Sequence, residues 1–297
     1  MTPSPIDAAR EAFEHTRRHL FPAQANRWFA LGFVAFLDQC GRSGIGGGPS
    51  PGGWNGGRGG NGPDWSEITA WIASHVGLIV IVAAMALTLV VALTALVLWV
   101  NTRGVFMYAD NVATGRADIG RPWREHAEKA GSLFAWRFAL AIGTLVGVLV
   151  LLLLGAIAVV PIVKGGGVGA AAVVALIGLA FALVFLVVAS ALVSTALRDF
   201  VAPLQMEAGR TCGDAARVFL GLLRGHPGCF ALYVLLKIAF QAAAGLVAVL
   251  ACCICCCAVL TPVVSQTVLQ PLFYFERAWS LHLLRQLGHD VTASEVS

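Results

Sequence analysis

Charged residues are absent from four long stretches of this chain, and these stretches dominate its pattern of hydrophobic and polar positions. They cover residues 68–102, 138–163, 165–197 and 238–275. A helix that crosses the hydrocarbon of a bilayer needs about 20 apolar residues, and a charge within it is costly. Each stretch is long enough to cross once, and the last is long enough to cross nearly twice. The pattern therefore predicts an integral membrane protein built from α-helices.

The predicted membrane helices cover residues 68–100, 132–162, 168–196, 229–256 and 260–283. The last two share one uncharged stretch, which we expect to break at Pro262, near the polar Thr261, Ser265 and Gln266. A shorter apolar segment, 27–40, supplies a sixth helix. The predicted fold class is thus all-α, a polytopic membrane bundle of about six helices with amphipathic helices at the interface.

Whether segment 27–40 crosses the membrane depends on two opposing arguments. Its length lies below the usual minimum of about 17 residues, which favours a re-entrant or interfacial helix. A crossing, however, places most arginines and lysines on one side, as the positive-inside rule requires. We therefore expect it to cross, with both termini in the cytoplasm, and keep the interfacial helix as the alternative. Asp38, near its end, is then expected to meet the outer water.

This topology divides the chain into five segments. Residues 4–20 read as an amphipathic helix, because Ser4, Pro5 and Asp7 form a helix-start pattern and Ile6 and Phe13 share one face. The expected segments are a cytoplasmic amphipathic helix (1–26), a short first membrane helix (27–40), a glycine-rich extracytoplasmic loop (41–67), a five-helix membrane domain (68–284) with cytoplasmic loops 101–131 and 197–228, and a cytoplasmic tail (285–297).

Composition excludes a soluble domain. Only 12% of the 297 residues are charged and 58% are hydrophobic, whereas soluble domains carry about 25% charged residues. The expected location is the plasma membrane of a prokaryote, with membrane lipids as partners and no nucleic acid.

Arginines in segment 210–224 form the first candidate site. Arg210, Arg217 and Arg224 are spaced by seven, so on a helix they drift by only about 20° per step and form one stripe. Such a helix is expected to lie in the interface and contact anionic lipid head groups. The alternative is an ordinary basic loop without lipid specificity.

Lys237 and Gln241 form the second candidate site, a possible polar site within the membrane. Lys237 falls two turns inside the fifth predicted helix, and Gln241 follows one turn later on the same face. An ionisable group at this depth is a functional hypothesis by default. The alternative is that the lysine extends to the cytoplasmic interface through its flexible stem.

No catalytic, cofactor or metal site is predicted, and we expect the protein not to be an enzyme. The C-x-x-C spacings within 252–257 lie on an apolar helix, without the second pair or histidine partners typical of zinc. His15 and His19 share a face with Glu11, but no zinc-protease motif is present, so an ordinary amphipathic helix is the better interpretation. The acidic residues available on the cytoplasmic side show no recognisable spacing: Asp110, Asp118, Glu125, Glu128, Asp199, Glu207 and Asp214.

Four short segments, together with the glycine-rich loop, carry a family resemblance: residues 27–37, 106–112, 198–203 and 276–284. In their order they resemble a family of uncharacterised bacterial and archaeal multi-pass proteins, similar to the membrane domain sometimes fused to glycerophosphodiester phosphodiesterases. The resemblance implies the membrane topology and leaves the activity open. The acidic and histidine ligands of the phosphodiesterase barrel have no match here, so hydrolase activity is not implied.

The function expected from these observations is a non-enzymatic membrane component, namely a scaffold, partner-binding or envelope-maintenance protein. The alternative is a transporter or lipid-handling carrier with Lys237 and Gln241 in its pathway. A coupled transporter usually holds carboxylates or paired ionisable groups near the midplane, and none lies in the second to fifth predicted helices.

Overall fold

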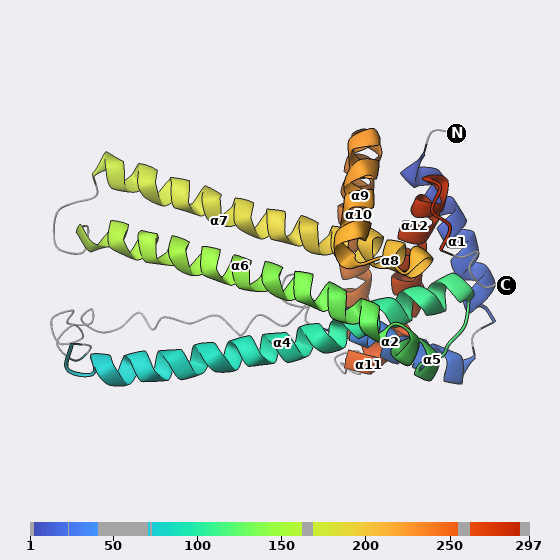
Figure 1. The fold of residues 1–297 in the computed structure, drawn as a ribbon, viewed down its shortest axis with the longest axis horizontal. Coiled ribbons are helices and arrows are strands. Elements are labelled where there is room, and N and C mark those ends of the chain that lie inside the picture. Colours follow the sequence, from blue (N-terminus) through green and yellow to red (C-terminus); the bar gives the residue numbers. More distant parts are fainter. Residues whose placement is uncertain are drawn as a thin grey trace.

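All regular structure in the described part of the chain is helical, which confirms the predicted fold class (Figure 1). The computed structural model describes residues 3–22, 24–40, 71, 73–161, 169–254 and 262–291. The glycine-rich segment 41–67 lies outside these ranges. The helices are α1 (Pro5–Leu20), α2 (Ala25–Gln39), α4 (Val76–Thr114), α5 (Gly120–Glu125), α6 (Ala127–Pro161), α7 (Ala170–Ala196), the π-helical turn η2 (Leu197–Val201), α8 (Ala202–Ala208), α9 (Cys212–Gly225), α10 (Pro227–Ile254), α11 (Pro262–Val268) and α12 (Gln270–Gln286).

Four of the described helices are long and apolar enough to cross a membrane. They are Val76–Thr114, Ala127–Val160, Ala170–Glu207 and Pro227–Ala251. In Figure 1, α4, α6 and α7 extend together to the left, whereas α10 runs across this direction, near α9 and α12. Large apolar side chains on them face outward, and Phe185 is 75% exposed. Such a continuous apolar surface is typical of helices that contact lipid.

The predicted first and last membrane helices take a different form. Segment 27–40 corresponds to α2, which has only 15 residues, and 260–283 is divided into α11 and most of α12. Among the described helices, neither α2 nor the α11–α12 pair has the length and hydropathy of a span. α2 is short, and α12 contains the charged residues Glu276 and Arg277, which are buried within the protein.

We call one part of the molecule the head. It consists of α1, α2, α5, η2, α8, α9, α11 and α12, together with the ends of α4, α6 and α10 that pack against them. Its core lies where the apolar part of α4 ends, because residues 104–113 of that helix are all buried. The predicted cytoplasmic loops 101–131 and 197–228 are helical over most of their length and belong to this head. α2 packs antiparallel to the end of α4, since Arg27 donates to the Gly115 carbonyl and Asn101 donates to the Asp38 carbonyl.

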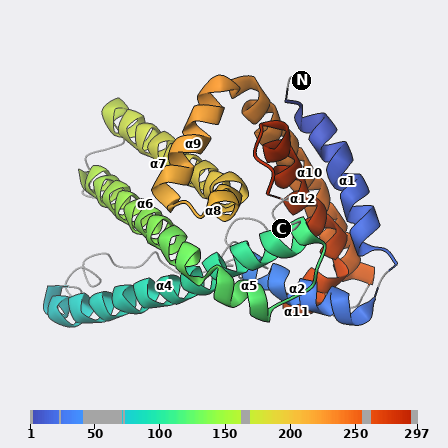
Figure 2. The same ribbon diagram turned by 45° about the vertical axis from the view of Figure 1, so that its right-hand side comes forward.

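The first and last helices lie side by side in both views (Figures 1 and 2). Ser4 caps α1 as predicted, because its hydroxyl accepts from the Asp7 N–H. The buried face of α1, however, is made largely of small residues, including Ala8 and Ala12. They allow close packing on α12, whereas Ile6 and Phe13 of the predicted apolar face point outward.

The rings of three histidines from α1 and α12 are in contact at this junction. The ring of His15 lies 4.4 Å from that of His19 and 5.3 Å from that of His282. Burial lowers the pKa of all three, and lowers that of His282 to about 4, with a further lowering by the charge of Arg285. His282 is therefore neutral near pH 7, and its 3.3 Å approach to Glu11 is not an ion pair there.

Gly104→Ala should loosen the packing of α2 on α4. A Cβ at this position would lie 2.5 Å from the carbonyl carbon of Leu37 and 2.6 Å from the Asp38 nitrogen, and backbone atoms move only at a cost. We expect thermal unfolding in detergent to show a loss of about 1–3 kcal/mol. Gly131→Ala is the matched control, because its Cβ would meet nothing within 4 Å. Equal effects of the two substitutions would contradict the observed packing.

Acidification should destabilise the contact between α1 and α12. A folded pKa of about 4 for His282 lies below the unfolded value of about 6.5, so the unfolded state binds the proton more readily. The stabilising contribution is complete above about pH 6.5 and is lost as the pH falls toward 4, by roughly 2 kcal/mol between pH 7 and 5. Hydrogen exchange of α1, corrected for intrinsic rates, measures the loss.

His282→Gln is expected to reduce this pH dependence, whereas His226→Gln, at an exposed helix end, should leave it unchanged. The charged and titratable groups that face His282 are Glu11, His15, Arg285 and Asp290. An unaltered pH profile in His282→Gln would assign the effect to another group.

Candidate functional site: a buried ion cluster

Six charged side chains from four helical elements meet in the head, where the apolar part of the membrane helices ends. We call this group the ion cluster; its described members are Asp38 of α2, Arg198 and Asp199 of η2, Lys237 of α10, and Glu276 and Arg277 of α12. Their side chains are at most 6% exposed. Three acids and three bases balance in formal charge, so the group enters the interior without a net charge.

Arg198 connects three of these elements. Its Nε donates to Asp38 Oδ1 at 3.0 Å, and Nη2 donates to the other oxygen, a bidentate pair. Its Nη1 lies 3.3 Å from both Asp199 Oδ1 and Glu276 Oε1. A planar guanidinium suits such multiple carboxylate contacts, so this one side chain holds α2 and α12 against η2.

Lys237 makes the corresponding connection from α10. Its Nζ donates to Asp199 Oδ2 and lies 2.9 Å from Glu276 Oε1. Tyr233, one turn earlier on the same face, donates its hydroxyl to Asp199 at 3.0 Å. Gln241, one turn later, donates to Glu276 at 3.4 Å. Spacing by four thus places three polar groups of α10 along one line facing α12 and η2.

Arg277 fastens the cluster to the backbone. Its two terminal nitrogens donate to the carbonyl of Arg198 at 2.7 Å and to that of Val105 at 2.8 Å. The side chain is fully buried. It therefore joins α12 to both α4 and η2 through hydrogen bonds to backbone carbonyls.

The π-helical turn η2 directs the side chains of two consecutive charged residues, Arg198 and Asp199, toward different partners. Pro203, inside this continuous helix, has no N–H and crowds the carbonyl of residue 199. Just before it, the Ala202 N–H bonds to the Leu197 carbonyl, five residues back. All five residues of η2 are buried, with Arg198 facing α2 and α12 and Asp199 facing α10. Single π-turns within α-helices frequently occur at functional sites.

The structure places the predicted pair at this cluster, since Lys237 is a member and Gln241 donates to Glu276. The alternative, in which Lys237 extends to water, is wrong, because carboxylates of η2 and α12 reach its ammonium group inside the protein. The expectation that Asp38 meets the outer water is also wrong. Asp38 is 1% exposed and pairs with Arg198 of η2, which directly follows α7.

The predicted arginine stripe is only partly formed. Arg217 and Arg224 lie on the exposed side of α9, but Arg210 precedes the helix, in the turn between Gly209 and the capping Thr211. The apolar side of α9 is occupied by protein, since Phe219 stacks on Phe200 at 5.3 Å. The expectation that Arg210, Arg217 and Arg224 contact lipid head groups stays a prediction.

The other cluster members were not predicted as site residues, although their positions in the sequence carry a signal. Arg198 is the first charge after one uncharged stretch, Lys237 the last before another, and Glu276 the first after it. Charges at such boundaries are also expected where a helix simply leaves the membrane. Their mutual pairing depends on contacts between distant segments, and no local spacing encodes it.

Chemically, the ion cluster is a set of mutually satisfied charges. Removing ions from water costs several kcal/mol per ion, and pairing with good hydrogen-bond geometry offsets this cost. No group of three His, Cys, Asp or Glu in the described ranges has an arrangement suited to a metal ion. The geometry therefore fits the joining of helices.

Arg198→Gln should destabilise the protein by about 3–5 kcal/mol, because Asp38 and Glu276 lose a buried counter-charge. Unfolding by denaturant in mixed micelles measures this effect. Arg217→Gln, whose side chain is 84% exposed, serves as the control and should change stability by at most about 0.5 kcal/mol. Adding Asp38→Asn to Arg198→Gln should recover part of the loss; no recovery would contradict the direct pairing.

Comparison with known proteins adds a family and no activity. No curated protein and no solved structure matches the chain. The resemblance to a membrane domain associated with phosphodiesterases stays a prediction. A family profile covers residues 3–287, nearly the whole chain, and the protein therefore belongs to the family of unknown function DUF7544.

Proposed function

We propose that this protein is a non-enzymatic membrane scaffold, in which apolar helices anchor a rigid helical head that binds partner proteins. The observation that carries this proposal is the ion cluster. Its charges are enclosed and used in mutual pairs, and they join α2, η2, α10 and α12 into one unit. Such an arrangement suits a head of fixed shape.

The apolar parts of the four candidate spans support an anchoring role. Their most hydropathic windows are 0–6% buried, so their side chains are available to lipid. Three hydroxyls within them bond to carbonyls of their own helix: Thr88 to Ala84, Thr144 to Leu140 and Ser190 to Val187. A transport pathway needs polar groups that face one another across helices, and these hydroxyls are already satisfied locally.

The proposed orientation places the head in the cytoplasm of a prokaryotic cell, with both termini on that side. The positive-inside rule supports this orientation, because exposed arginines gather on the head helices α1, α5 and α9: Arg10, Arg17, Arg124, Arg217 and Arg224. In this orientation Arg217 and Arg224 are available to anionic lipid head groups.

A transporter or lipid-handling carrier is the second candidate. It is favoured by the paired ionisable groups Lys237, Asp199 and Glu276 and by the π-helical turn next to them. These groups, however, lie where the apolar part of α7 ends, and their charges are balanced without an added ion. The scaffold therefore ranks first.

Native mass spectrometry of the protein released from its own membranes tests the two functions. The informative variant combines Lys237→Met with Asp199→Asn, which removes one charge of each sign and often leaves stability nearly unchanged. A scaffold predicts a protein partner at fixed stoichiometry in both wild type and variant. A carrier predicts a bound lipid or solute that the variant loses. Finding no protein partner on the wild type would overturn the scaffold proposal.

A further inference from the structure

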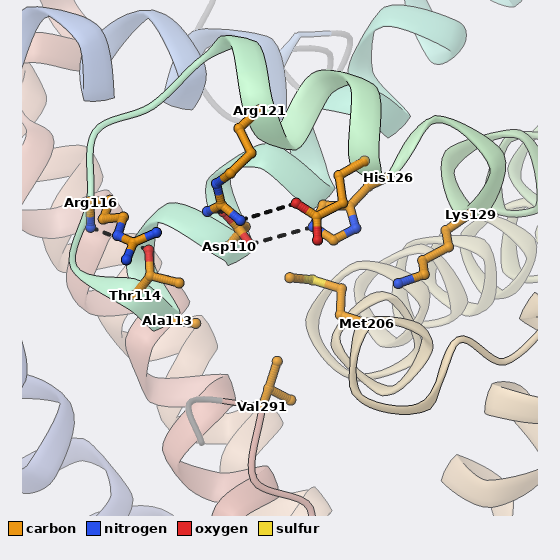
Figure 3. A pocket seen from close by; sticks show the side chains of 10 residues that line it. Asp110, Ala113, Thr114, Arg116, Arg121, His126, Lys129, Met206 and Val291 are labelled. Atoms are coloured by element: carbon orange, nitrogen blue, oxygen red, sulfur yellow. Dashed lines mark hydrogen bonds and ion pairs between the residues drawn. The ribbon is translucent and has the colours of Figure 1, made fainter. Parts of the chain in front are cut away.

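A cavity of about 340 Å³ lies in the head, beyond the ion cluster, at the end of α4 (Figure 3). The end of α4, α5, the start of α6, α8 and Val291 near the C-terminus enclose it. Its volume is in the range of sites for small organic molecules. The residues that line it are Asp110, Ala113, Thr114, Arg116, Arg121, Glu125, His126, Lys129, Met206 and Val291.

The two carboxylates of the cavity are partnered within the protein. Arg121 donates to Asp110 at 2.6 Å and to Glu125 at 3.1 Å. His126 Nε2 lies 3.4 Å from the other oxygen of Asp110. These contacts bring together acidic residues whose spacing in the sequence had no recognisable pattern. They also reduce the repulsion that Asp110 and Glu125 would exert on an anion in the cavity.

The remaining polar lining is cationic. Apart from His126, the charged lining residues are three cations (Arg116, Arg121 and Lys129) and two carboxylates (Asp110 and Glu125). Lys129 is half-buried and forms no ion pair with any described residue. Figure 3 shows Arg116 and Lys129 on opposite sides of the cavity. The lysine ammonium group and the arginine guanidinium group are both common ligands of phosphate.

The position of the cavity indicates a ligand from water. Thr114 lies 13 residues beyond Asn101, where the apolar part of α4 ends, which corresponds to about 20 Å along a helix. A lipid phosphate at the membrane interface would not reach so far. Ala113, Met206 and Val291 add an apolar wall, which suits an organic anion better than a bare inorganic ion.

We propose that this cavity binds a small, water-soluble organic phosphate through Lys129 and Arg116. Asp110 and Glu125, held by Arg121, face the same space and accept hydrogen bonds from amino or hydroxyl groups of the ligand. The ion cluster, by contrast, has no role in this binding.

Isothermal titration of the purified full chain in maltoside detergent tests the proposal, with inorganic phosphate and O-phosphoethanolamine as probes. We expect saturable binding of O-phosphoethanolamine at one site per chain, tighter than that of inorganic phosphate, and weakening as salt is raised. Lys129→Gln and Arg116→Gln should each weaken it by about fivefold to tenfold, and Lys129→Arg should retain it.

Arg124→Gln is the matched control, because Arg124 is an exposed cation of α5 that does not line the cavity. Thermal unfolding of each variant confirms that it is folded. Absence of saturable binding, or an equal loss in Arg124→Gln and Lys129→Gln, would overturn the proposal. So would binding seen only with nanodiscs that contain phosphatidylglycerol, since that result identifies a lipid head group as the source of the phosphate.

Discussion

The pairing of six buried charges is the constraint on which the head of this protein depends. Each carboxylate of the ion cluster must find a cation, because an uncompensated ion in the interior costs several kcal/mol. Arg198 satisfies this requirement for Asp38 and Glu276, and Lys237 satisfies it for Asp199. The four elements that supply these residues are therefore held in fixed positions relative to one another. Apolar contacts alone would specify these positions less strictly.

Around this cluster the molecule separates into two environments. The head has a packed core with edge-to-face aromatic contacts, such as those among Phe200, Tyr233 and Trp279. The apolar parts of α4, α6 and α7 instead leave large side chains outward, where lipid provides the favourable surroundings. α4 belongs to both environments, since it is exposed and apolar before residue 100 and buried after it. This change along one helix marks the boundary between anchor and head.

Prediction succeeded where a property is local. The cap of α1 depends on residues three apart, and Ser4 and Asp7 indicate it directly. It failed where the same residue has two acceptable environments. Asp38 and Lys237 would also be stable in water at an interface, and the residues next to them in the sequence are compatible with that position. The protein buries them, because partners distant in the sequence make burial acceptable. Arg210 lies outside the predicted helical stripe for a different reason, since Gly209 ends one helix and Thr211 caps the next.

The amino-acid sequence by itself determined the all-α class and the long apolar helices, because hydropathy averaged over some twenty residues decides which segments leave water. Only the tertiary structure decided which charges meet. Arg198 bonds to Asp38 across 160 positions and to Glu276 across 78. Lys129 and Arg116 likewise line one cavity only because α4, α5 and α6 pack against one another. Ion pairing acts over a few ångströms in space, and no pattern of neighbouring residues specifies such an approach.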